Sequence, residues 1–213
     1  MNTSQINKVF SILLLFTVSP IFIFGNTLED ANKAFNGANY EKAVKLYEKS
    51  CIEGSAEGCF EIGRIYFDGQ IAKTNFKKAV SYYEKACANG HAESCYRAGN
   101  VYYKGDVQKR DISKALDRFT SACVKGNNAG GCGMLGTMSY KGEGTEKDVY
   151  AALELFKFAS KNGDPEGING LAQMLEKGEI VKADKNKALR MYEKACKDGS
   201  DVACENLYRM QGH

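Results

Sequence analysis

Apolar side chains recur at helical spacing in short blocks, and each block begins with a polar residue and ends with glycine. In one block, Val80, Tyr83 and Ala86 fall on one face of a helix. An asparagine or aspartate stands four residues before a recurring alanine, where its side chain can accept a bond from the backbone as an N-cap. These residues are Asn39, Asn75, Asp111, Asp148 and Asp184. We predict that each of these helices ends at a glycine, because glycine adopts the left-handed terminating conformation at little cost. The terminating glycines are Gly54, Gly90, Gly126, Gly163 and Gly199.

A second helix is predicted to follow each of these glycines. Its cap residues form another column, in which only histidine is a weak N-cap type. They are Ser55, His91, Asn128, Asp164 and Ser200. The second helices are predicted to end at Gly69, Gly105, Gly142 and Gly178, and loops of about five residues lead to the next cap.

These columns repeat with a period of about 36 residues, which is typical of stacked helix pairs. The segments YEKSC, YEKAC and YEKAC are near copies of one another. A single helix pair cannot bury its apolar face, whereas stacked pairs share one elongated core. We therefore predict an all-α solenoid of five repeats over residues 39–213, the last one truncated, with a capping helix over 26–38.

The chain has eight cysteines, and they follow the same period. In four repeats, two cysteines eight or nine positions apart flank the glycine turn, which suits the Cα separation of a disulfide. We predict the pairs Cys51–Cys59, Cys87–Cys95, Cys123–Cys132 and Cys196–Cys204, each worth roughly 2–3 kcal/mol. In the fourth repeat Ser160 and Ile168 replace the pair and Asp164-Pro165 stiffens the turn, so we expect this repeat to be the least stable.

Residues 1–25 have the layout of a secretory signal peptide. One positive charge, Lys8, precedes a mainly apolar run from Val9 to Phe24, and Gly25 supplies a small residue for cleavage. The run is shorter than the ~20 residues of a membrane-spanning helix, although an uncleaved anchor is the alternative. We expect a periplasmic or secreted protein in an oxidising compartment, with no membrane attachment after cleavage.

The composition argues against several other classes of protein. The charge is nearly balanced, with 29 Lys+Arg and 26 Asp+Glu, so we expect no nucleic-acid partner. The basic cluster from Lys104 to Arg110 is interpreted as a solvated connector. Zinc sites favour closer cysteines and clustered histidines, so neither a metal nor a cofactor is expected. Catalytic cysteine chemistry would need an unpaired thiol beside a base.

The segments FKKAVSYYEKACANGHAESCYRAGNVYYKGD and NKALRMYEKACKDGSDVAC resemble Sel-one-like repeats, which are relatives of the tetratricopeptide repeat. The cysteine pairs and the signal layout resemble the Helicobacter cysteine-rich protein family. The departures are the missing pair at Ser160 and Ile168 and an inserted residue within Asn127 to Gly131. The resemblance implies a right-handed αα superhelix and an adaptor that binds a peptide or protein. It also implies a β-lactamase-type hydrolase with slow penicillin binding and hydrolysis, because members of the second family are commonly labelled β-lactamases.

The motifs of β-lactam hydrolysis are not recognisable in the sequence. Serine β-lactamases use Ser-x-x-Lys, and the nearest imitation is the Thr74 to Lys77 segment at a predicted cap. His91 fills a capping column, and the other histidine is the terminal His213. Gly131 to Gly136 matches GxGxxG, but it lies within a helical repeat and not after a strand. Catalytic residues therefore stay unknown, and enzyme activity stays an open alternative.

The inner face of the superhelix is the better candidate surface. By analogy with tetratricopeptide repeats, the second helices line it and aromatic and amide side chains suit peptide binding. The candidate groove residues are Arg64, Phe67, Asn100, Tyr103, Thr137, Tyr140, Gln173 and Glu176. The alternative is that the aromatic column merely packs between repeats. The leading hypothesis is a scaffold that binds a peptide or protein; a cell-wall-related peptide or a β-lactam is the variant that the second family implies.

Overall fold

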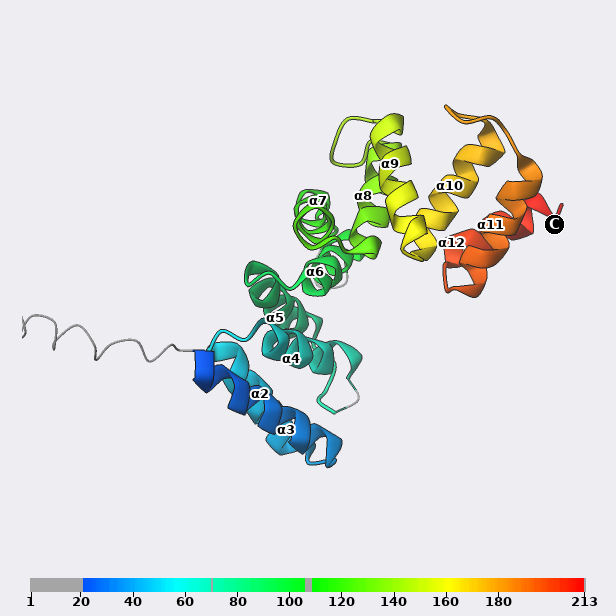
Figure 1. Ribbon diagram of the computed structural model, residues 1–213. Coiled ribbons are helices and arrows are strands. Elements are labelled where there is room, and N and C mark those ends of the chain that lie inside the picture. Colours follow the sequence, from blue (N-terminus) through cyan, green and yellow to red (C-terminus); the bar gives the residue numbers. More distant parts are fainter. Residues whose placement is uncertain (1–20, 70, 106–108, 213) are drawn as a thin grey trace, which may run out of the picture.

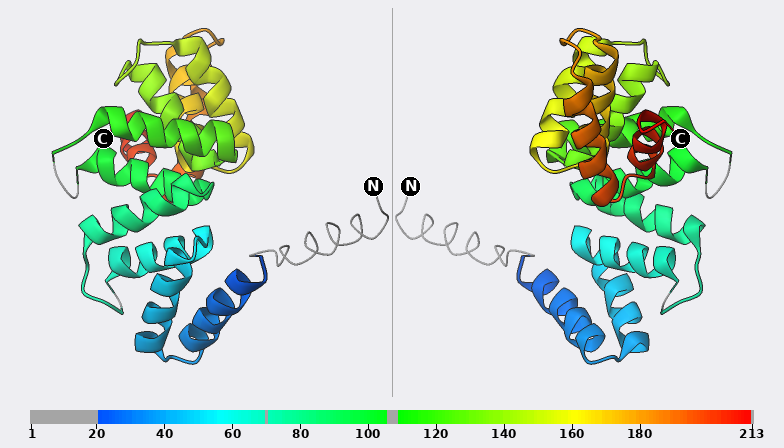
Figure 2. Two further views of the ribbon diagram at one scale, coloured as in Figure 1. Left: turned by 90° about the vertical axis from the view of Figure 1, so that its left-hand side faces the viewer. Right: turned by 90° about the vertical axis from the view of Figure 1, so that its right-hand side faces the viewer.

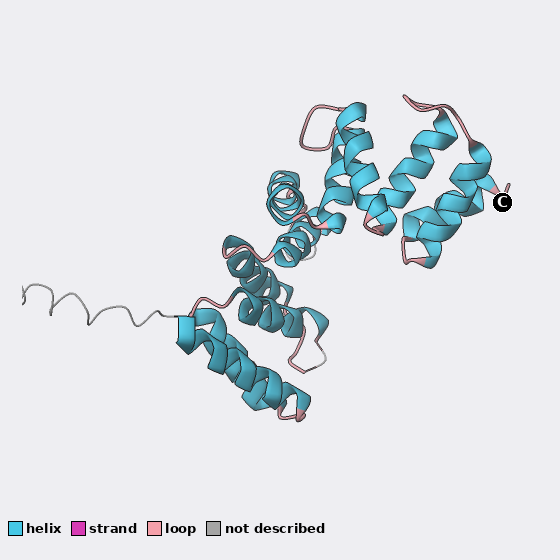
Figure 3. Cartoon of the chain, viewed as in Figure 1, coloured by secondary structure: helices cyan, strands magenta, loops and turns pink. Residues whose placement is uncertain are grey.

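The computed structural model describes residues 21–69, 71–105 and 109–212, which fold into helices without a strand (Figure 3). The elements are α2 (Ile21–Asn36), α3 (Tyr40–Ile52), α4 (Ala56–Asp68), α5 (Phe76–Ala88), α6 (Ala92–Lys104), α7 (Ile112–Thr120), the π-helical turn η1 (Ser121–Lys125), α8 (Ala129–Lys141), α9 (Val149–Lys161), α10 (Pro165–Lys177), α11 (Lys185–Lys197) and α12 (Asp201–Met210). Helix pairs follow one another along a curved stack (Figures 1 and 2). The predicted all-α solenoid is confirmed.

The predicted caps explain where these helices begin and end. The Asn75 side chain accepts a hydrogen bond from the backbone N–H of Lys78, and the other first-helix caps make the matching bond. His91 also caps its helix, because its Nδ1 accepts from the N–H of Ser94 at 3.2 Å. The glycine after each of α4, α6, α8 and α10 is left-handed, as predicted. The helix boundaries are thus set by local cap residues and glycines.

Consecutive repeats pack an aromatic ring against a small residue. The ring of Tyr83 on α5 lies against Gly63 on α4, where an added Cβ would stand 2.8 Å from the ring. Gly99 with Phe119 and Gly136 with Phe156 repeat this contact along the stack. These aromatic side chains are almost fully buried. Glycine is needed here because it lets the second helix of one repeat approach the first helix of the next.

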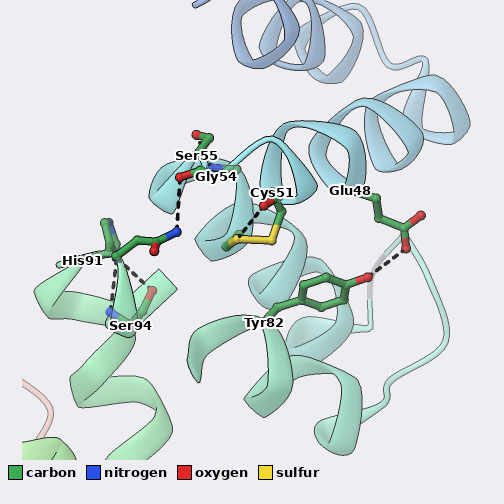
Figure 4. The surroundings of a disulfide bond; sticks show 10 residues. Glu48, Cys51, Gly54, Ser55, Tyr82, His91 and Ser94 are labelled. Carbon is green, nitrogen blue, oxygen red and sulfur yellow. Dashed lines mark hydrogen bonds between the residues drawn. A yellow bond between two sulfur atoms is a disulfide. The ribbon is translucent and has the colours of Figure 1, made fainter. Parts of the chain in front are cut away.

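The four predicted disulfides are present, and no free cysteine remains. Their Cα separations lie between 4.4 and 4.7 Å. Figure 4 shows Cys51 in the first bond, beside the Tyr82 hydroxyl that donates to Glu48 of the preceding repeat. In the fourth repeat, Ile168 is buried in an apolar cluster with Ala172 and Tyr192. Apolar packing therefore occupies the position of the missing disulfide.

The inserted residue of the third repeat is accommodated earlier than predicted. The last turn before Gly126 widens into η1, and the N–H of Asn128 bonds to the carbonyl of Ala122, six residues back. The corresponding bond in the other repeats spans five residues, as from Ser55 to Ser50. Gly126 has a φ of −110°, and Asn127 takes the left-handed conformation with a φ of 49°. The prediction that Gly126 is the left-handed residue was therefore wrong: the widened turn moves that conformation one residue on and keeps the Asn128 cap in register.

The first helix covers the first repeat. Ala31 and Ala34 of α2 are buried against α3, and the Tyr47 hydroxyl donates to Asn32 at 2.7 Å. Helix α2 begins at Ile21 and therefore crosses the cleavage position expected after Gly25. The rest of the expected signal segment, residues 1–20, lies outside the described residues, so the boundaries at 25 and 38 stay predictions. No helix in the described part of the chain is long and apolar enough to cross a membrane.

Candidate functional site

A central pocket of about 410 Å³ lies on the face formed by the second helices. Its wall includes Tyr96 from α6, Met134 from α8, Gln173 from α10 and Val202 from α12. Because α6 and α12 lie far apart in the sequence yet contribute to the same pocket, this face of the solenoid is concave there. The volume falls in the range of small-ligand sites and can accommodate a few residues of an extended peptide.

Five of the eight candidate groove residues line the central pocket, namely Asn100, Tyr103, Thr137, Tyr140 and Gln173. The other three are engaged elsewhere. Arg64 pairs with Glu61 at 2.7 Å, and Phe67 packs against Phe76 and Tyr83. Glu176 accepts hydrogen bonds from Arg209 and Tyr192. The aromatic column therefore has two kinds of member, one that packs between repeats and one that also reaches the pocket.

The two tyrosines of this column use their hydroxyl groups to join repeats. Tyr103 donates to Glu143 at 2.8 Å, and Tyr140 donates to Glu179 at 2.7 Å. Burial and the bond to Glu143 raise the pKa of Tyr103 to about 12, and burial raises the pKa of Tyr140. Both phenols are thus neutral at physiological pH. Since their hydroxyls already have acceptors, these tyrosines offer the pocket mainly ring surface.

Sequence reasoning missed Asn169, which lies one helical turn before Gln173 on α10. The Asn169 side chain is only 5% exposed and lines the pocket. Its Oδ1 accepts from Asn206 Nδ2 at 3.0 Å. The sequence signal was available, because residues four apart share one face of a helix. Tyr96, at the matching position of α6, also lines the pocket and was missed for the same reason.

Charged residues occupy opposite edges of the pocket. Lys104 and Lys141 are at the C-terminal ends of α6 and α8, whereas Glu166 and Asp201 are in the first turns of α10 and α12. The second helices run in the same direction, so their N-terminal ends form one edge and their C-terminal ends the other. One Glu166 oxygen accepts from the Ser200 hydroxyl at 2.8 Å. The lysines of the pocket wall thus lie at the C-terminal ends of their helices, and its acidic residues lie at the N-terminal ends.

The residues considered for catalysis have structural contacts. His91 caps α6, stacks on Phe60 and has its Nε2 3.2 Å from Glu57 Oε2. Thr74 and Lys77 are exposed on either side of the Asn75 cap. The GxGxxG segment lies inside α8. Within the described ranges, no group of three potential metal ligands comes together.

Known proteins with the same fold include two solved structures. The chain is similar to c5321, a protective antigen of uropathogenic Escherichia coli strains, with a TM-score of 0.73, 22% identity and coverage of 88% of this chain. It is also similar to a Sel1 repeat protein from Oxalobacter formigenes, with a TM-score of 0.68, 26% identity and coverage of 78% of this chain. The chain spans only 41% and 65% of these two proteins, respectively.

A curated relative and a family model give the family. A 40-residue segment of the chain is 45% identical to HcpE of Helicobacter pylori. This segment is 19% of this chain and 11% of HcpE, whose name describes it as a candidate beta-lactamase. The Sel1 repeat model matches residues 37–55, 56–91, 92–126, 130–164 and 165–200. The first match covers α3, and each later match covers the second helix of one repeat and the first helix of the next, so that together they extend over most of the chain. This protein therefore belongs to the Sel1 repeat family.

Proposed function

We propose that this protein is a disulfide-stabilised scaffold that binds a segment of peptide or protein in the groove formed by its second helices. The central pocket carries this proposal, because three successive second helices place Asn100, Thr137 and Gln173 at matching positions on its wall. Amide and hydroxyl groups at such regular positions suit the main chain of a peptide, and the neighbouring tyrosine rings supply apolar contact.

The cysteines support an oxidising compartment for this scaffold. The eight cysteines of the chain form four disulfides, and structural disulfides persist in oxidising compartments. With the signal-like residues 1–25, this supports a periplasmic or secreted protein. The partner is then an extracytoplasmic peptide or protein.

The β-lactamase alternative has much weaker support. It comes from the name of HcpE, whose similarity to this chain extends over 40 residues. The wall of the central pocket contains Thr137 and Lys141 but no serine, cysteine or histidine among the described residues. Ring surface and amides on a concave face favour binding over acyl transfer.

A display experiment tests the proposed function. The oxidised, processed protein is used to select binders from a random peptide library, and their affinities are measured by fluorescence polarisation. Asn100→Ala and Gln173→Ala should each weaken the selected peptides several-fold. Tyr150→Ala is the control, because Tyr150 is 72% exposed and lies on α9, the first helix of the fourth repeat, outside the central pocket. If neither pocket substitution changes the affinity of the selected peptides, the groove is not the binding surface.

A further inference from the structure

One polar side chain in the central pocket lacks part of its hydrogen bonding. Asn169 is only 5% exposed, and its Oδ1 accepts a hydrogen bond from Asn206 Nδ2. Its Nδ2 donates to no other residue in the ranges 21–69, 71–105 and 109–212, and it is not among the fully enclosed polar atoms that lack a partner, so water reaches it from the pocket. An acceptor on a ligand can take the place of this water, so Asn169 offers a hydrogen-bond donor to a molecule in the pocket.

The surroundings of Asn169 suit a main-chain carbonyl as that acceptor. Gln173 lies one turn further along α10, and Thr137 and Asn100 stand at the corresponding positions of α8 and α6. A polypeptide presents carbonyl and N–H groups at regular intervals of about 3.3 Å per residue. Side-chain amides can both donate to and accept from such groups. A series of them across three helices therefore matches an extended chain.

The charges around the pocket give that chain a direction. Lys104 and Lys141 form no ion pair with another residue in the ranges 21–69, 71–105 and 109–212, and neither does Asp201. Glu166 has a hydrogen bond from Ser200 but no cationic neighbour there. Opposite charges on a ligand would be attracted to opposite edges, and reversal would bring like charges together.

We propose that the central pocket binds an extended peptide in a single orientation, with an acidic side chain at the Lys104–Lys141 edge, a basic side chain at the Glu166–Asp201 edge and a main-chain carbonyl on Asn169. This inference rests on the proposed function. It adds the chemical class of the peptide and a specificity role for residues that the family resemblance did not single out.

Pairs of peptides with identical composition test the orientation. The probes are end-capped decapeptides that contain one Asp and one Lys at every combination of positions in a serine and tyrosine background. They are labelled with a fluorophore and titrated with the oxidised, processed protein. For the spacing that fits the pocket, one order of Asp and Lys should bind about tenfold more tightly than the reverse order. Added salt should reduce this difference.

Single substitutions assign each contact. Lys141→Ala should remove the preference for Asp, and Asp201→Asn should remove the preference for Lys; both positions are exposed, so folding is preserved. Asn169→Asp keeps the acceptor for Asn206 but removes the donor, and should weaken both preferred and neutral peptides. Asn206→Ala is its control, because it removes the Asn206–Asn169 bond without altering the pocket donor.

The outcomes separate this inference from the proposed function. If peptides with the two orders of Asp and Lys bind with equal affinity, the oriented acidic and basic contacts are overturned. If Gln173→Ala still weakens these peptides, the groove remains the binding surface. Equal losses for Asn169→Asp and Asn206→Ala would overturn the role of Asn169 as a ligand donor. If no probe and no library peptide binds through the pocket, both the inference and the proposed function are overturned.

Discussion

Asn128 Nδ2 donates a hydrogen bond to Glu93 Oε2 across 3.0 Å, and this bond joins the cap of the third repeat to the first turn of the second. Two other junctions have the matching contact, His91 to Glu57 at 3.2 Å and Ser200 to Glu166 at 2.8 Å. The junction between the third and fourth repeats differs. Gly130 occupies the position of the glutamate, and the cap is Asp164. An ionised carboxylate cannot donate, and glycine offers no side chain to accept, so this inter-repeat bond is missing.

Replacing Asp164 with asparagine should stabilise the protein at neutral pH. Burial raises the pKa of Asp164 to about 6, from an ordinary value of 3.8. A carboxyl group with a raised pKa in the folded state destabilises that state when ionised. The penalty is fully present above about pH 6 and disappears below about pH 4, with an upper limit of about 3 kcal/mol. Asp164→Asn keeps an acceptor for the N–H of Gly167 and removes the charge.

Thermal unfolding of the two proteins between pH 4 and pH 8 checks this prediction. The melting temperature of Asp164→Asn should exceed that of the parent at pH 7.5, and the two should converge near pH 4. Asp164→Ala is the control, because it removes both the charge and the cap and should gain less. A lower melting temperature for Asp164→Asn at pH 7.5 would show that attraction to the helix dipole outweighs the cost of burial.

A fifth disulfide should form when the fourth repeat is given the missing cysteines. Ser160 and Ile168 occupy the positions that are bridged in the other repeats with Cα separations of 4.4–4.7 Å. A ring of this size contributes about 2.5 kcal/mol, from which the lost burial of Ile168 subtracts about 1 kcal/mol. The double variant Ser160→Cys/Ile168→Cys should therefore show no free thiol by mass spectrometry and a slightly higher melting temperature. Two reactive thiols in the folded double variant would contradict the equivalence of the repeats.

The sequence predicted those features that depend on residues within one repeat or at a fixed offset in the next. The pairing of Cys87 with Cys95 and the cap at Asn75 follow from local spacing alone. The widened turn at Ser121–Lys125 could not be placed, because an extra residue can be absorbed in the helix or in the loop with similar spacing. The membership of Asn169 in the pocket depends on the curvature of the stack, which brings α12 near α6. The curvature results from small rotations that add up over several repeats, so it cannot be predicted from the residues at any single position of the repeat.

The glycine at position 126 should be required for close packing and not for its backbone conformation. Its φ of −110° is open to any residue, but an added Cβ would overlap the Cβ of Ala92. Gly126→Ala should therefore cost about 1–3 kcal/mol through overpacking. Asn127→Gly should be neutral or slightly stabilising, because Asn127 holds the left-handed conformation with a φ of 49°. Chemical denaturation of the two variants measures both effects, and the opposite ranking would contradict the geometry of this turn.

Oxidised, purified protein should not turn over a chromogenic cephalosporin. The hydroxyls of Tyr103 and Tyr140 in the central pocket are engaged, and burial and hydrogen bonding raise the pKa of Tyr103 to about 12, so this phenol is a poor nucleophile at neutral pH. Hydrolysis is followed by absorbance, with Thr137→Val and Tyr96→Phe as the controls for the remaining hydroxyl groups of the pocket. Turnover that survives repurification and disappears in either variant would favour the hydrolase alternative.

Hydrogen exchange should show that stability differs from repeat to repeat. Each repeat contacts chiefly its neighbours, so a disulfide protects mainly the helix pair that it closes. In the oxidised protein, amides of α9 and α10 should exchange fastest among the central repeats, because that pair has no disulfide and lacks the cap contact at Asp164. Reduction should accelerate exchange in α3–α8 and α11–α12 by about tenfold or more, since each ring contributes about 2.5 kcal/mol, and should affect α9 and α10 least. Mass spectrometry of peptic fragments resolves these segments. Uniform acceleration along the chain would instead mean that the solenoid unfolds as one cooperative unit, and that local closure of each hairpin does not govern its stability.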